Sequence, residues 1–329
     1  MSDTTSNLGS WARRVDGALV AEPADERELI EVLHVLADRG VKLHRDIALS
    51  RARMLDVGHV QQRSMTVRVG AGVVLRELDA RLRSAGLTLG PLSPAAMALR
   101  LGEFLEGPYA GLRSICGGRL EPLCTSISAV LSDGRRLQTS HAPRSAAGPD
   151  LSALVLGGQG RLAVATAATV RCEPHCERDV RVTWSFPRAA AFVAGLQHAI
   201  AEGFWPWRVH VDPRGGAVLA EIRWASTVGS VERDRDLITR CAQQAGGHGL
   251  SELSVGDGDE PVSEREATWG AVQRALEAGR PLQLFRLTLA TVIARGEVDG
   301  LRLDTPAAWH PLSARLLAVD GRGILGGAP

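Results

Sequence analysis

The sequence predicts an α+β protein with two domains, and three observations support this prediction. The chain has 329 residues, which is more than a single hydrophobic core normally serves. Its first part opens with the pattern of a strand, a helix and a second strand. Beyond Pro174 the pattern changes to the order β-α-β-β-α-α-β, which is typical of an antiparallel sheet with helices on one face.

The opening unit can be followed residue by residue. Ala18 to Glu22 predicts a short strand. Asp25 is placed to cap a helix, with Glu28 three residues on as in a capping box, and Gly40 ends that helix. Leucines and isoleucine at helical spacing give the helix an apolar face. Val41 to His44 predicts the second strand.

The middle of the first part predicts further strands and turns. Met54 to Val69 favours a strand that leads through Gly70-Ala71-Gly72 into a helix, whose apolar face is formed by Leu75, Leu78 and Leu82. Ile127 to Leu137 favours a hairpin that turns at an Asp-Gly pair.

The stretch from Gly148 to Arg171 is the most informative of the chain. Asp150 can cap a short helix that continues to Leu154. Gly157, Gly158 and Gly160 then form a turn that permits positive φ and close approach of a ligand, and its backbone amides could cradle a phosphate or a flavin ring. An ordinary tight turn explains the same residues. Leu162 to Val170 predicts a buried strand.

These segments resemble, in consistent order, the FAD-binding domain of the PCMH-type, or vanillyl-alcohol-oxidase-like, flavoproteins. The glycine-rich turn after Asp150 is similar to the family pattern Gly-Ser-Glu-Gly-Thr-Leu-Gly, and TVRVGAGVVLRELDARLRSAGLTL (66–89) is similar to its strand, Gly-Ala-Gly turn and helix. ISAVLSDGRRL (127–137) resembles the strand and hairpin after the family's second flavin loop. The resemblance covers about residues 20 to 175 and is nearest to glycolate-oxidase-type FAD-binding subunits. It implies a two-subdomain FAD-binding domain over residues 1–175 and a smaller cap domain of antiparallel sheet and helices over residues 176–329.

The resemblance also implies FAD as the cofactor and a set of residues that bind it. The family's second flavin loop falls on the segment from Arg100 to Gly118, and its last loop on the turn after Asp150. The implied cofactor-binding residues are Gly102, Gly111, Gly118, Gly157, Gly158, Gly160 and Val164.

The chain departs from the family where the cofactor loops should be. The family's pyrophosphate loop is rich in glycine, whereas the chain reads VKLHRDIALS (41–50), with no glycine and an apparent deletion. His44 and Arg45 could still meet a phosphate by charge, but Asp46 beside them favours a plain solvated turn. In the later loops Glu103 and Arg161 replace a glycine and a threonine. Pro108 and Ala163 replace further family residues, and Glu106 adds negative charge near any diphosphate.

The C-terminal part carries one candidate substrate pair. Its expected elements are strands at 181–186, 208–212, 217–224 and 282–290 and helices at 187–203, 231–245 and 263–279. Arg208 and His210 have the same parity on one strand and therefore share a sheet face. Such a pair could bind a 2-hydroxy acid, with arginine on the carboxylate and histidine as the base for the hydroxyl, although a pair of this kind is more often only a polar strand face. No catalytic residue is assigned.

Composition sets the remaining expectations. A net charge of +1 gives no electrostatic case for nucleic acid, and no apolar run is long enough to cross a bilayer. With no recognisable secretory signal, the chain is expected to be cytoplasmic, with its five cysteines reduced. Cys172, His175 and Cys176 lie close together but lack a second ligand pair, so no metal site is expected.

Two functions of different class follow. The first is an FAD-dependent oxidoreductase, or a subunit of one, that acts on a small 2-hydroxy acid such as glycolate or lactate. The second is a cofactor-free, non-catalytic relative that serves as a structural or regulatory partner of a flavin-bearing subunit. Both allow a flavin-bearing or iron–sulfur partner subunit, and neither predicts an oligomeric state.

Overall fold

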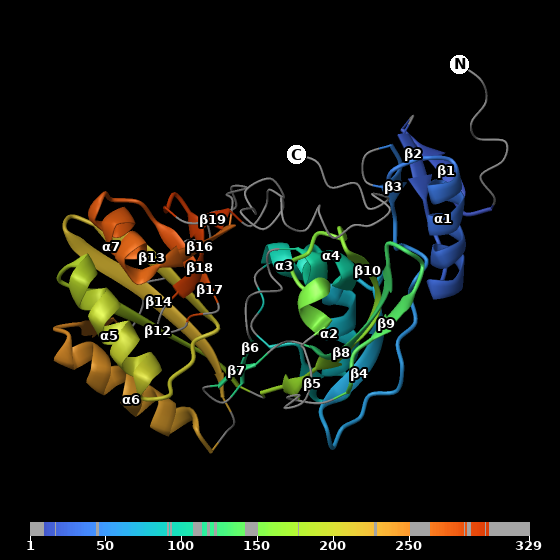
Figure 1. Cartoon of the computed structure of the whole chain (residues 1–329). Helices are drawn as coiled ribbons and strands as arrows, with labels where there is room; N and C mark the ends of the chain where they lie inside the picture. The colour runs from blue at the N-terminus through green and yellow to red at the C-terminus, as the bar shows by residue number, and fades with distance from the viewer. Residues whose placement is uncertain are drawn as a thin grey trace.

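A computed structural model describes most of residues 10–302; residues 17, 44–45, 91, 93, 108–113, 117–118, 122–123, 142–150, 177, 227–228, 251–263, 286, 288–290 and 300 lie outside the description. The protein has the predicted two-domain α+β fold, with the N-terminal and C-terminal parts forming separate groups of sheets and helices (Figure 1).

A small three-stranded sheet and one helix open the first domain. Strands β1 (Ala12–Val15) and β2 (Ala18–Ala21) are antiparallel, and β2 pairs in parallel with β3 (Ala48–Leu49). Helix α1 (Glu26–Asp38) begins as predicted, because the Asp25 carboxylate accepts the Glu28 N–H at 2.8 Å. Its leucines and Val32 are buried against this sheet.

The predicted strand from Val41 to His44 is wrong. Leu43 makes only an isolated bridge to Ile47, and the strand that pairs with β2 comes later, at β3. The reason is a tight turn: the Asp46 carboxylate accepts the Lys42 N–H at 2.8 Å, and the Asp46 N–H donates to the Lys42 carbonyl. The chain therefore turns before it can enter the sheet.

A four-stranded antiparallel sheet in the order β4-β10-β8-β9 completes the first domain. These strands are β4 (Thr66–Gly70), β8 (Cys124–Leu131), β9 (Arg136–Gln138) and β10 (Ala163–Arg171). The hairpin of β8 and β9 and the buried strand β10 confirm the predictions, whereas β4 is only the end of the long strand expected from Met54. Three helices lie on this sheet: α2 (Leu75–Arg83), α3 (Pro94–Ala98) and α4 (Leu101–Glu106). The connections contain the short strands β5 (Leu87–Thr88), β6 (Ser114–Cys116) and β7 (Arg119–Glu121) and a 3₁₀ turn (Leu151–Leu154).

Strand β10 lies between two cores. Val164 packs into the core around α1, whereas Ala163 and Ala165 face the core around α2 and α4. This alternation fixes which side chains of the strand meet α4, and α4 carries one of the predicted flavin loops.

The cap is one antiparallel sheet with its helices on a single face (Figure 1). Within the described residues the strand order is β15-β12-β14-β13-β17-β18-β16-β19. The strands are β12 (Arg178–Phe186), β13 (Arg208–Arg214), β14 (Ala217–Ser226), β15 (His248–Leu250), β16 (Glu264–Thr268), β17 (Leu282–Phe285), β18 (Thr291–Gly296) and β19 (Leu301–Arg302). The helices α5 (Ala189–Ala201), α6 (Val231–Gln244) and α7 (Trp269–Glu277) cover the core.

The predicted helix from Ser263 is partly wrong. Its first described residues form β16, and the helix begins only at Trp269. The Thr268 hydroxyl accepts the Ala271 N–H and caps α7 at that point. The predicted strand from Leu282 ends early, at Phe285, and a separate strand β18 follows.

The segment that joins the two sheets is tied to the first domain. Strand β11 (Glu173–Pro174) pairs with β5, and the His175 N–H donates to the Gly86 carbonyl. Among the described residues no three histidine, cysteine or acidic side chains come close enough to hold a metal ion. No described helix is long and apolar enough to cross a membrane.

Candidate functional site

The structure brings together the described residues of the two later flavin loops. Helix α4, which starts beside Gly102, lies against the turn that contains Gly157 and against β10. The Gly157 N–H donates to the Leu105 carbonyl, and the Gln159 N–H donates to the Glu106 carbonyl. The loops predicted from distant parts of the sequence therefore meet at the C-terminal end of α4.

Two further amides of the glycine-rich turn also donate to backbone carbonyls of the protein. The Gly158 N–H donates to Val155, and the Arg161 N–H donates to Gly158. Gly157 and Gly160 have φ angles of 69° and 68°, as the predicted need for positive φ requires. Gly111 and Gly118 lie outside the described residues, and the cofactor-binding role of all these glycines and of Val164 stays a prediction.

A buried ion pair fills the place where the loops meet. The Arg51 guanidinium lies 2.6 Å from the Glu106 carboxylate, and both side chains are less than 10% exposed. The same carboxylate accepts the Ala165 N–H at 2.7 Å, and Arg51 Nε donates to the Ala165 carbonyl. Burial raises the pKa of the Glu106 carboxyl above its usual range, while Arg51 and the Ala165 N–H oppose that rise.

Arg51 also occupies the space beside Gly102. A Cβ built on Gly102 would lie 2.7 Å from Arg51 Cδ and 3.1 Å from the Ala71 methyl group. A Cβ on Gly72 would lie 1.9 Å from the Arg51 carbonyl oxygen. Gly72 is therefore a glycine because two backbones touch there, which agrees with its interpretation as part of a structural turn.

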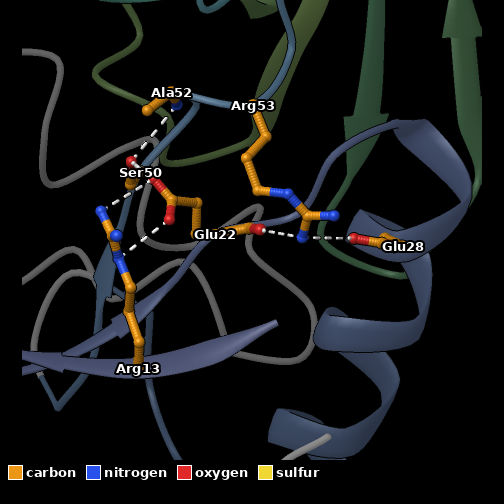
Figure 2. A network of polar contacts seen from close by, with 6 residues as sticks. All are labelled: Arg13, Glu22, Glu28, Ser50, Ala52 and Arg53. Atoms are coloured by element: carbon orange, nitrogen blue, oxygen red, sulfur yellow. Dashed lines mark hydrogen bonds and ion pairs between the residues drawn. The ribbon is translucent and has the colours of Figure 1, made fainter. Parts of the chain in front are cut away.

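A polar network holds the chain that carries Arg51 (Figure 2). The Glu22 carboxylate accepts hydrogen bonds from Arg13 and from the Ser50 hydroxyl, at 3.1 and 2.9 Å. Arg53 donates to the Glu22 carbonyl and to the Glu28 carboxylate. Residues 50–53 are thereby fixed to β2 and α1. The backbone that carries Arg51 is therefore held in place on both sides of that residue.

Helix α4 begins with an acidic residue where the family has glycine. The Glu103 carboxylate accepts the N–H of Arg100 at 2.9 Å, as in a capping box, and the Arg100 guanidinium donates to the Gly72 carbonyl. Glu103 therefore stabilises the start of α4 instead of leaving bare backbone there.

The cap presents a second polar group of residues. On β13, Val209 and Val211 enter the core under the helices, so Arg208 and His210 lie on the opposite face, as predicted. His210 lies opposite Glu221 on β14 and Gln283 on β17. All three are less than 10% exposed.

This face of the cap also carries a row of arginines. Arg223 on β14 lies opposite Arg181 on β12 and opposite Arg208 on β13. Like charges placed opposite one another destabilise a sheet. The buried Glu221 carboxylate partly offsets this, since it accepts a hydrogen bond from Arg223 at 2.8 Å and lies 3.8 Å from Arg181.

The arginine row faces the first domain. Phe285 follows Gln283 by two residues on β17, so it lies on the same face, and it packs into the core around α2 and α4. Helices α5, α6 and α7 cover the opposite face (Figure 1). A separate hollow of about 290 Å³ lies within the cap, beside Arg188 and the turn at Gly215, and takes no part in either group.

Comparison with known proteins agrees with the predicted family. A family model described as "FAD binding domain" matches residues 42–140. The chain is 27% identical over 129 residues to the FAD-linked oxidoreductase YgcU of Escherichia coli, covering 39% of this chain and 27% of that protein. It is 26% identical over 187 residues to a D-lactate dehydrogenase of Archaeoglobus fulgidus, covering 52% and 42%. The chain thus spans less than half the length of these curated relatives.

Solved structures show the same fold. An alkyldihydroxyacetonephosphate synthase superposes with a TM-score of 0.69 at 15% identity, over 93% of this chain and 75% of that one. A p-cresol methylhydroxylase superposes with a TM-score of 0.59 at 11% identity, over 93% and 80%. The predicted PCMH-type fold is confirmed, and the family match with the FAD-linked relatives supports FAD as the cofactor of this type of domain.

The described residues do not fit FAD in the family's usual arrangement. The space at Gly102 holds Arg51, and the amide of Ala165 is taken by Glu106. The amides of Gly157, Gly158, Gln159 and Arg161 donate to backbone carbonyls of the protein. One feature is favourable to an anion: a buried guanidinium nitrogen of Arg161 has no hydrogen-bond partner. A single cation does not replace a glycine-lined cradle, so we derive no chemistry through a flavin bound to these residues.

Sequence reasoning missed Arg51 and the arginine row. Glu106 carried a usable signal, because an acidic residue on the short apolar helix LGEFLE needs a buried partner. The identity of that partner depends on a contact between residues 55 positions apart. The row of Arg181, Arg223 and Arg208 depends on strand register, which no local pattern reveals.

Proposed function

We propose that the chain is a PCMH-type FAD-binding oxidoreductase and works as a subunit of an FAD-linked oxidoreductase that acts on a small 2-hydroxy acid. The observation that carries the proposal is the FAD-binding-domain match at residues 42–140, within a chain that follows a PCMH-type fold along its described length. The likeness to glycolate-oxidase-type subunits, the domain boundary near residue 175 and a partner that carries flavin or an iron–sulfur cluster are parts of the same proposal.

The substrate class rests on the cap. Arg181, Arg223 and Arg208 give the cap face a local excess of positive charge over Glu221, which suits a carboxylate. His210 lies one row away and can accept the proton of a neighbouring hydroxyl. The D-lactate dehydrogenase of Archaeoglobus fulgidus is a relative whose name points to the same class of acid.

A second candidate function is favoured by one specific observation. The Arg51–Glu106 pair fills the place where the flavin loops meet, as a chain without its own flavin would require. The chain would then be a structural or regulatory partner of a flavin-bearing subunit, with no chemistry of its own.

The test of both candidates is an assay of the native assembly. A tagged chain is isolated from its own organism, and reduction of an artificial electron acceptor is measured with glycolate or lactate, with malonate as the control acid. The proposal expects flavin absorbance in the isolated complex and acceptor reduction with the 2-hydroxy acid alone. A colourless complex without activity would refute it.

Variants of one strand separate the two candidates. We expect His210→Gln to lower turnover of the assembly by roughly 100-fold or more, and Arg208→Gln to raise KM for the acid. The matched control is Arg214→Gln on the same strand, whose ion pair with Asp212 lies at the exposed end of β13. Full activity in both cap variants, with the complex intact, would assign the chain the non-catalytic role.

A further inference from the structure

We propose that the Arg51–Glu106 ion pair takes the place of the flavin within this domain, so that the isolated chain is folded and complete without FAD. The proposal concerns the chain alone and does not depend on the assembly or on the 2-hydroxy acid.

The Glu106 carboxylate lies where the backbone N–H of Ala165 needs an acceptor. The Ala165 N–H points at the carboxylate at 2.7 Å, and the carbonyl of Glu106 accepts the Gln159 N–H. A buried N–H without an acceptor is costly. Glu106 therefore satisfies, from within the chain, a donor next to the predicted cofactor-binding residue Val164.

The planar guanidinium of Arg51 lies where we propose that the flavin ring would otherwise be. The guanidinium Nε lies 2.9 Å from the position that a Cβ on Gly102 would take. The space beside the Gly102 Cα is thus occupied by the Arg51 side chain. A flavin in the family's position would have to displace Arg51 and leave Glu106 as an unpaired buried carboxylate.

The turn at Asp46 sets the path of the chain that leads to Arg51. The Asp46 carboxylate accepts the Lys42 N–H, and β3 follows at Ala48–Leu49. The Ser50 hydroxyl donates to the Glu22 carboxylate, and the Ser50 N–H donates to the Ala21 carbonyl. The chain reaches Arg51 directly from the sheet, as Figure 2 shows for its neighbours Ser50 and Ala52. The short turn at Asp46 thus places Arg51 next to Gly102, and the Arg51 side chain fills the space there.

The first measurement uses the unmodified chain, expressed alone. We expect a protein without flavin absorbance, and a melting temperature that does not change when FAD is added up to saturation of the assay. Flavin bound at purification, or a saturable rise in melting temperature with FAD, would overturn the proposal. The same measurement on Glu103→Gly should also show no uptake, because Arg51 and the short turn remain.

The second measurement asks whether Arg51 fills the space at Gly102. Gly102→Ala is expected to lower the melting temperature of the otherwise unchanged chain, because the new methyl group meets Arg51 Cδ. In an Arg51→Ala background the same substitution should have a clearly smaller effect, because only the 3.1 Å contact with the Ala71 methyl group remains. Equal loss in both backgrounds would show that Arg51 does not occupy the site.

A third measurement compares single and paired replacement. Arg51→Met and Glu106→Leu should each lower the melting temperature, and the double variant should recover part of the loss, since it leaves no unpaired charge. Additive losses would contradict the pair. The control is Arg27→Met with Glu31→Leu, an exposed pair on α1, for which no recovery is expected.

Discussion

The substitution Arg51→Met tests the buried pair most sharply, because its effect should change with pH. The Arg51 and Glu106 side chains are 6% and 7% exposed, so methionine leaves an uncompensated carboxylate in the core. Breaking a buried pair in this way costs about 3–5 kcal/mol when the remaining group is charged. That is a large fraction of a typical unfolding free energy of about 5–15 kcal/mol.

The pH dependence follows from the raised pKa of Glu106. Burial raises this pKa above its value in the unfolded chain, so between the two pKa values the folded chain binds more protons and its stability falls as pH rises. Arg51 is the largest influence that opposes the shift. In Arg51→Met the free energy of unfolding therefore falls more steeply as pH rises. Towards the acidic end of the pH range, where a larger fraction of Glu106 is protonated and keeps its hydrogen bond to Ala165, we expect the loss to shrink to about 1–2 kcal/mol.

Urea unfolding followed by circular dichroism, at several pH values between 5 and 8, measures the difference between the two proteins. Groups that titrate in both proteins cancel in that difference, and a constant slope with urea shows that the same surface is exposed. Arg27→Met, at an exposed ion pair on α1, is the control and should cost no more than about 1 kcal/mol at any pH. A difference between the parent and Arg51→Met that stays flat across the pH range would refute the assignment of Glu106 as the group left unpaired.

Three further predictions concern single residues of the first domain. Gly72→Ala should cost about 3 kcal/mol or more in urea unfolding, since its methyl group would overlap the Arg51 carbonyl; a loss below about 1 kcal/mol would contradict the close contact. Asp25→Ala should cost about 1 kcal/mol through loss of the bond to the Glu28 N–H, and Asp25→Asn should restore most of it. Burial raises the pKa of Cys172 to about 12, so iodoacetamide should label it only after unfolding, and rapid labelling of the native chain would refute its burial.

Elements with a strong local pattern could be predicted from the sequence. Helix α1 combines an apolar stripe with the Asp25 cap, and the hairpin of β8 and β9 turns at Gly134, whose φ of 84° suits glycine. In each case the residues that decide the conformation lie within a few positions of one another. The errors came where a local contact competed with the pattern, as at Asp46, which turns the chain before the expected strand.

The candidate site could be predicted only in outline. The resemblance located the flavin loops, and the structure brings Gly102 and Gly157 together around α4. What fills the space between them depends on a long-range partner, Arg51, that nothing in its own neighbourhood marks. The departures at Glu103 and residues 41–50 predicted that the site had changed, but not that a side chain had taken its place.

An apolar side chain could also fill an emptied cofactor site, so the choice of an ion pair needs a physical reason. The Ala165 N–H and carbonyl both point into the site, as a donor and an acceptor that a leucine could not satisfy. A carboxylate meets the donor, and a guanidinium meets the carbonyl while neutralising the carboxylate. Because backbone groups survive any change of side chain, a flavin site that closes from within should be closed by polar residues. Glu106→Leu alone therefore leaves the buried Arg51 guanidinium without its counter-charge, and it also leaves the Ala165 N–H of β10 without an acceptor.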